Sequence, residues 1–97
     1  MYETNNKIAV QKHEGLQVEK VVKNDVFEIL SISLEKGANF PEHTSPTNAQ
    51  LVVLDGDIQF NINGKSFQLT SEQLFDFPKE VPHSVKANEN SKFLIIR

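Results

Sequence analysis

The stretch 51–69, LVVLDGDIQFNINGKSFQL, decides the fold. It begins with the apolar run LVVL, breaks at an Asp-Gly pair, and alternates apolar and polar residues over 57–62, as a half-buried strand does. Asn63 and Gly64 then give the strongest hairpin signal of the chain, because a two-residue turn of this type needs positive φ at both positions. With the return strand at 65–69, the stretch predicts three consecutive strands, the last two of which form a hairpin.

Similar strand signals recur on both sides of this stretch. Segments rich in β-branched and aromatic residues, separated by turn residues, predict further strands at 16–22, 26–34, 74–77, 84–87 and 92–97. The resulting strands, about eight of them at intervals of roughly 8–12 residues, leave no room for crossover helices. The pattern is typical of an antiparallel sandwich or barrel, so we predict an all-β fold.

Composition narrows the classes of function. A chain of 97 residues predicts one domain. Its net charge is −3, with acids and bases interspersed, so it lacks the basic surface that nucleic acid requires. The longest apolar runs, LVVL and FLII, are too short to span a membrane, and the absence of cysteine excludes disulfides. We therefore expect a cytoplasmic protein that binds neither nucleic acid nor membrane.

Two of the three histidines are candidate site residues. His43 lies in FPEHTSPTNAQ and His83 in VPHSV, and each is expected to stand beside a proline where a strand begins. A histidine that enters a barrel strand can point into the lumen, because side chains alternate inward and outward. His13, in the polar stretch QKHEG, is expected at the surface.

The segments around these two histidines resemble the two sequence motifs of the cupin family. Gly37, His43 and Gly56 match the opening glycine, the first histidine and the closing glycine of the first cupin motif. Pro78 and His83 match the proline and the histidine of the second. The resemblance covers residues 30–97 and implies a double-stranded β-helix, the jelly-roll cupin barrel, which we place at 16–97.

The metal ligands of the cupin motifs are only partly present. Ser45 stands where the first motif has its second histidine, and Ala49 where it has an acid, which leaves His43 and His83 as candidate metal ligands. A catalytic metal normally takes three or more protein ligands. Gln50 could offer an amide oxygen if a bulge slips the register by one residue. The glycines and the asparagine of the second motif are also replaced, by Glu72, Glu80 and Ala87.

Three functions remain open at this point. The first is a small-molecule-binding cupin without a catalytic metal or catalytic residue, whose pocket includes His43, Ser45, Gln50 and His83. The second, implied by the resemblance, is a metal-dependent enzyme of the dioxygenase, isomerase or decarboxylase type, in which the two histidines hold a weakly bound Fe, Mn, Ni or Zn ion. The third is an oligomeric scaffold with a vestigial pocket. The residues favour binding over catalysis, and so the first function.

The resemblance also implies a homodimer, because small cupins protect sheet edges by pairing strands across subunits. Residues 1–15 form an N-terminal segment ahead of the barrel. The sequence leaves two alternatives open for this segment: it is flexible, or it pairs with a partner subunit.

Overall fold

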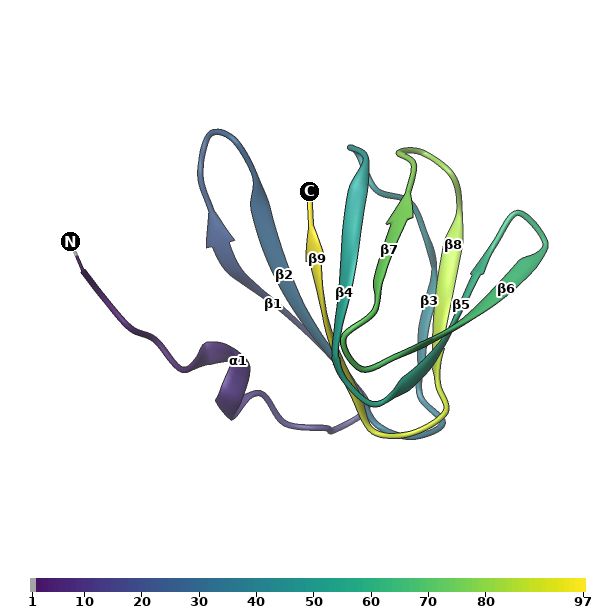
Figure 1. Ribbon diagram of the computed structural model, residues 1–97, viewed down its shortest axis with the longest axis horizontal. Helices are drawn as coiled ribbons and strands as arrows, with labels where there is room; N and C mark the ends of the chain where they lie inside the picture. Colours follow the sequence, from purple (N-terminus) through teal and green to yellow (C-terminus); the bar gives the residue numbers. More distant parts are fainter. Residues whose placement is uncertain (1) are drawn as a thin grey trace.

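The computed structural model describes residues 2–97, which fold into two facing β-sheets (Figure 1). One sheet has the strand order β1-β2-β9-β4-β7 and the other β3-β8-β5-β6, and all neighbouring strands are antiparallel. This arrangement confirms the predicted all-β jelly roll. In the described residues the elements are α1 (Lys7–Val10), β1 (Leu16–Lys23), β2 (Glu28–Leu34), β3 (Asn39–His43), β4 (Ala49–Asp55), β5 (Asp57–Ile62), β6 (Lys65–Thr70), β7 (Leu74–Phe77), β8 (His83–Ala87) and β9 (Ser91–Ile96).

The core lies between the two sheets and follows the alternation of the strands. In β4 the inward positions Leu51 and Val53 are buried, and in β5 Ile58 and Phe60 are fully buried. Phe93 of β9 is fully buried as well. Apolar side chains from both sheets thus meet in one layer, which is what a sandwich requires.

The predicted hairpin at 63–64 is confirmed. Asn63 has a φ of 53° and Gly64 a φ of 70°, the two positive values that this turn needs. Ile62 pairs with Lys65 directly before and after the turn.

The strand β3 was not among the predicted strands. It lies at an edge of its sheet, and Pro41 interrupts its pattern, which is tolerated in an edge strand because the outer N–H groups have no ladder partner. His43 therefore ends a strand, whereas the sequence placed it at the start of one. The predicted strand 26–34 begins later, at Glu28, because the Asn24 side chain accepts hydrogen bonds from the N–H groups of Val26 and Phe27 in a turn.

The N-terminal segment lies against the outer face of the five-stranded sheet. Ser33 Oγ donates to the carbonyl of Lys12 (2.7 Å), and Ser31 Oγ donates to the side-chain oxygen of Gln11 (2.7 Å). Lys92 Nζ donates to the Gln11 carbonyl (3.0 Å). These contacts explain why both serines are fully buried although they face away from the core.

Pairing of the N-terminal segment 1–15 with a partner subunit stays a prediction, and Met1 lies outside the described residues. The one helix within residues 2–97, α1, lacks the length and the apolar character of a membrane span.

Candidate functional site

The structure brings the two predicted histidines together. His43 ends β3 and His83 begins β8, and the two are paired across these neighbouring strands. Their ring centroids are 4.3 Å apart, in an edge-to-face arrangement. His83 is buried and His43 is half-buried, so the pair leads from the core toward solvent.

Each imidazole is held by a backbone carbonyl two residues earlier. His43 Nδ1 lies 2.6 Å from the carbonyl oxygen of Pro41, and His83 Nδ1 lies 2.9 Å from that of Val81. Because a carbonyl oxygen can only accept, Nδ1 carries the hydrogen, and in the neutral ring Nε2 keeps its lone pair. Among residues 2–97 neither Nε2 has a hydrogen-bond partner, so both atoms are available to a ligand.

Aromatic side chains fix the orientation of both rings. His83 packs against Phe77, with ring centroids 4.6 Å apart, and stacks on Phe60 at 5.3 Å. Phe40 stacks on His43 at 4.0 Å, with the planes 17° apart. The two imidazoles are therefore rigid parts of an aromatic cluster, which reduces the entropy lost when a ligand binds to them.

The pKa of His83 lies below the ordinary histidine value. Burial is the main cause, because it penalises the charged imidazolium. The hydrogen bond to the Val81 carbonyl acts in the opposite direction, whereas positive charge on His43 and Arg97 lowers the pKa further. His83 is thus held in the neutral form at neutral pH, with its Nε2 lone pair free.

Both histidines line a cavity of about 250 Å³ between the two sheets. This volume lies below the roughly 300–1,000 Å³ of pockets for drug-sized ligands, so the cavity suits a smaller molecule. Its polar lining consists of His43, Thr44, Ser45, His83 and Arg97. Its apolar walls come from both sheets and consist of Val18, Leu30, Ile32, Phe40, Phe60, Phe77, Val85, Phe93 and Ile95.

Ser45 lines the cavity as predicted, but its hydroxyl serves the local turn. Ser45 Oγ donates to the Thr47 carbonyl at 2.6 Å, and the Ser45 carbonyl accepts from the Glu80 N–H at 2.8 Å. The residue is 1% exposed. Its side chain therefore shapes the loop after β3, and its donor is already used.

Gln50 does not join the histidines. Its side chain is exposed on the outer face of β4, while Ala49 before it is buried. The register irregularity of β4 falls between Val53 and Asp55, too far along the strand to turn Gln50 inward. The slip on which a ligand role of Gln50 depended is therefore absent at this position.

The donor set does not fit a resident catalytic metal. Within residues 2–97 no three His, Cys, Asp or Glu side chains gather in a way that could hold a metal ion. Two imidazole Nε2 atoms remain, because Ala49 carries no donor and Ser45 Oγ is bonded to Thr47. A catalytic site normally needs at least one more protein ligand.

The glycine positions of the second motif keep a glycine-like backbone. Glu72 has a φ of 72° and Glu80 a φ of 64°, both in the left-handed region. A side chain in this region costs roughly 1–2 kcal/mol per residue. The two loops that hold these residues, one before and one after β7, therefore have the positive φ that glycine favours, although neither residue is a glycine.

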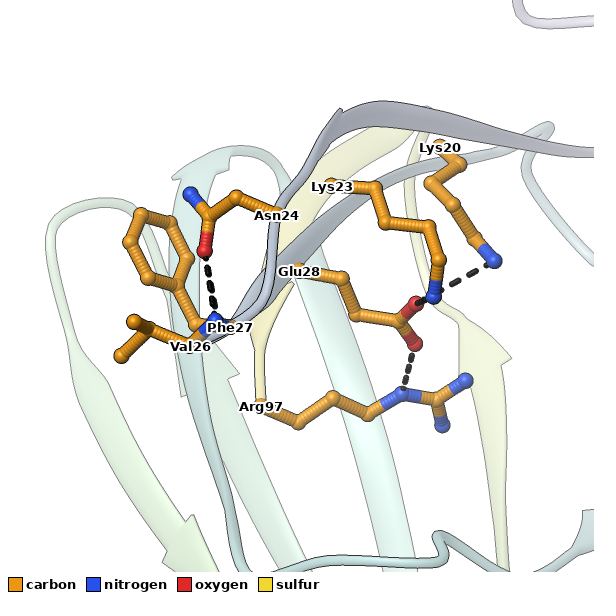
Figure 2. Close-up of polar contacts among 7 residues, drawn as sticks. All are labelled: Lys20, Lys23, Asn24, Val26, Phe27, Glu28 and Arg97. Atoms are coloured by element: carbon orange, nitrogen blue, oxygen red, sulfur yellow. Dashed lines mark hydrogen bonds and ion pairs between the residues drawn. The ribbon is translucent and has the colours of Figure 1, made fainter.

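Sequence reasoning missed a charged group at the cavity. Arg97 follows Phe93 and Ile95 at even spacing, so it lies on the inner face of the five-stranded sheet and lines the cavity with them. Its Nε donates to Glu28 Oε2 at 2.6 Å, and Lys20 Nζ lies 3.1 Å from Glu28 Oε1 (Figure 2). Alternation in the last strand was the signal that could have placed Arg97.

Glu28 is strongly stabilised as a carboxylate. The hydrogen bond from Arg97, followed by the one from Lys20, lowers its pKa from 4.5 to about 2. Its side chain is 15% exposed.

Comparison with known proteins now places the chain in a family. The family model described as "Cupin domain" matches residues 30–96, most of the two sheets. The chain belongs to the cupin family. Quercetin 2,3-dioxygenase of Bacillus subtilis (strain 168) is similar to this cupin, with 32% identity over 87 residues. The match covers 84% of this chain and 26% of that protein, so this cupin spans about a quarter of its relative's length.

Solved structures share the fold. An RmlC-like cupin protein from Desulfovibrio desulfuricans superposes with a TM-score of 0.86 at 22% identity, over 99% of this chain and 95% of that one. A cupin 2 conserved barrel domain protein from Leptotrichia buccalis gives a TM-score of 0.82 at 28% identity, over 93% of this chain and 44% of that one. This cupin therefore has the jelly-roll barrel of its family.

Proposed function

We propose that this cupin binds a small molecule in the cavity beneath His43 and His83, without a resident catalytic metal. One observation carries the proposal: both rings are fixed through Nδ1 and leave Nε2 unbonded at a cavity that both of them line. The two rings are thus held in place by the protein, and their Nε2 atoms are free to bond to a ligand.

The lining suits a ligand with an apolar body and a few polar groups. Apolar contact contributes roughly 25 cal/mol for each Å² removed from water, and most of the wall is aliphatic or aromatic. A neutral Nε2 accepts a hydrogen bond from a hydroxyl or N–H group of the ligand. Leaving such a group unpaired in a dry site costs roughly 1–3 kcal/mol, which favours ligands that supply the donor.

A thermal-shift screen with chelator present tests this proposal. Carboxylic acids, sugars and aromatic metabolites are added to the wild type and to two variants of β1. Val18 lines the cavity and is 48% exposed, so Val18→Phe narrows the entrance without overpacking the core. Val22 lies on the same strand, is 37% exposed and does not line the cavity, so Val22→Phe is the matched control.

We expect ligands that raise Tm in the wild type and in Val22→Phe, with a smaller shift in Val18→Phe. The proposal fails if no compound raises Tm, if Val18→Phe responds as fully as the control, or if binding needs an added divalent metal.

A metal-dependent enzyme is the second candidate. The relative named quercetin 2,3-dioxygenase and the two free Nε2 atoms favour it. Calorimetric titration with Fe, Mn, Ni and Zn ions separates it from the first proposal. Stoichiometric binding at micromolar affinity or better that disappears in the double variant His43→Ala/His83→Ala would support this candidate and overturn the metal-free one.

A further inference from the structure

A cationic side chain, Arg97, lines the cavity together with the histidine pair, and the proposed function does not yet assign it a role. We call the end of the barrel where these three residues lie the mouth. Arg97 is the one Lys or Arg side chain of residues 2–97 that lines this cavity. Its side chain is 20% exposed, so most of the side chain is withdrawn from water. A charge in such a position interacts more strongly with a partner than it would at the open surface.

Glu28 fixes the guanidinium but leaves most of its donors free. The carboxylate takes the Nε hydrogen at 2.6 Å, and Figure 2 shows the two terminal nitrogens directed away from Glu28. Among residues 2–97 neither terminal nitrogen has a hydrogen-bond partner. The rigid fork formed by these nitrogens matches the two oxygens of a carboxylate.

The charge of Glu28 does not neutralise Arg97. Lys20 and Lys23 lie 3.1 Å and 3.7 Å from Glu28 Oε1, so one carboxylate serves three cations. Lys20 and Lys23 do not line the cavity, so within this cluster Arg97 alone presents positive charge to it. Because Glu28 is shared with the two lysines, Arg97 keeps charge available to an anion in the cavity.

We infer that Arg97 is the anchor for the ligand of this cavity and that this ligand is a small monocarboxylate with an apolar body. The inference rests on the proposed function, because it names the class of molecule bound there. The carboxylate meets the free end of the guanidinium, and the apolar body lies among side chains such as Ile32, Phe93 and Ile95. Arg97 is the one Lys or Arg of residues 2–97 that lines the cavity, so it can pair with one negative charge there, and the second charge of a dianion would be left unpaired in a mostly apolar site.

Calorimetry with matched acids and amides, in the presence of chelator, tests the inference. The probes are 2-methylpropanoate, 4-methylpentanoate and phenylacetate, each compared with its own amide, which keeps the shape and removes the charge. The proteins are the wild type, Arg97→Gln, Arg97→Lys and Lys23→Gln. Lys23→Gln is the matched control, because it removes one positive charge from the same cluster at a residue that does not line the cavity.

We expect at least one acid to bind the wild type about tenfold more tightly than its amide, as a charge-assisted pair would give. Arg97→Gln should remove this preference, Arg97→Lys should restore part of it, and Lys23→Gln should keep it. Equal binding of acid and amide, equal losses in Arg97→Gln and Lys23→Gln, or no binding by any acid would overturn the inference. If neutral compounds from the screen still bind and remain sensitive to Val18→Phe, the proposed function stands although the carboxylate inference has failed.

Discussion

The polar groups are paired differently at the two ends of the barrel, which we call the floor and the mouth. At the floor, where the β4–β5 and β8–β9 turns meet in Figure 1, the groups close on one another. Ser91 Oγ donates to the Glu89 carbonyl (2.7 Å) and accepts from the Asp57 N–H (3.0 Å). Asn88 Nδ2 donates to Asp57 Oδ1 (2.9 Å).

At the mouth, three of the polar side chains that line the cavity are each fixed at one end and free at the other. His43 and His83 bond through Nδ1 and leave Nε2, while Arg97 bonds through Nε and leaves its terminal nitrogens. The difference separates two uses of polar groups in one small domain. Paired groups serve the fold, and half-paired groups that line a cavity are prepared for a ligand.

The largest expected effect is a loss of stability caused by a substitution at the floor. Gly56 has a φ of 103°, and a Cβ there would overlap the Ser91 side chain and the backbone of Asn90 and Ser91. Gly56→Ala should therefore lower the free energy of unfolding by about 3–5 kcal/mol, measured by urea denaturation. Gly37→Ala is the control: its φ is 85° but its Cβ would meet nothing within 4 Å, so only about 1–2 kcal/mol of backbone strain is expected. Equal losses in the two variants would contradict the overlap.

The next effect tests whether the mouth also contributes to stability. His83→Ala removes a buried ring that packs on Phe60 and Phe77, and we expect a loss of about 2–3 kcal/mol in thermal or urea unfolding. His43→Ala removes a half-buried ring and should cost less than about 1 kcal/mol. The difference in burial indicates that His83 contributes more to stability than His43. Similar losses in the two variants would contradict this.

A smaller effect concerns the carboxylate at the mouth. Glu28→Gln should lower the free energy of unfolding by about 1–2 kcal/mol at pH 7, because hydrogen bonds to charged groups are strong but solvent at this edge screens them. The pKa of Glu28 is depressed from 4.5 to about 2, so its contribution is complete above pH 4.5 and is lost as the pH falls toward 2.

Urea denaturation at several pH values measures this dependence. The wild type should approach the Glu28→Gln variant in stability as the pH falls through this window. A constant difference between the two proteins would refute the assigned ion pair.

The smallest expected effect is a gain in the free energy of unfolding. Glu80 has a φ of 64°, and Glu80→Gly relieves this left-handed strain while adding backbone entropy to the unfolded state. We expect a net gain of up to about 1 kcal/mol in the free energy of unfolding. Glu80→Ala is the control, because it removes the carboxylate and keeps the strain. A gain as large in Glu80→Ala would assign the effect to charge.

Most strands could be predicted from local sequence patterns, whereas contacts that depend on which strands pair could not. The hairpin at 63–64 was predictable because turn geometry and alternation act between sequence neighbours. Gln50 was predicted in the pocket on the condition that a bulge slips the register, and the sequence does not show where a bulge lies. In the structure the irregularity of β4 falls further along, between Val53 and Asp55, so the simple alternation holds and Gln50 is exposed.

The histidine pair followed from the family motifs, whereas the contact between Glu28 and Arg97 did not. These two residues are 69 positions apart in the sequence and meet because β2 pairs with β9. Sequence reasoning had no means to choose that pairing, so it could not predict the contact with Glu28, although alternation in the last strand could have placed Arg97 on the inner face.

The most direct test of the central claim is ¹⁵N NMR of histidine-labelled protein in chelator, with and without a ligand from the screen. The three histidines supply their own control, because His13 does not line the cavity. We predict that His43 and His83 carry hydrogen on Nδ1 and that ligand addition shifts their Nε2 resonances, while those of His13 stay in place. Unchanged Nε2 resonances on ligand binding, or shifts that appear only after a divalent metal is added, would contradict the account.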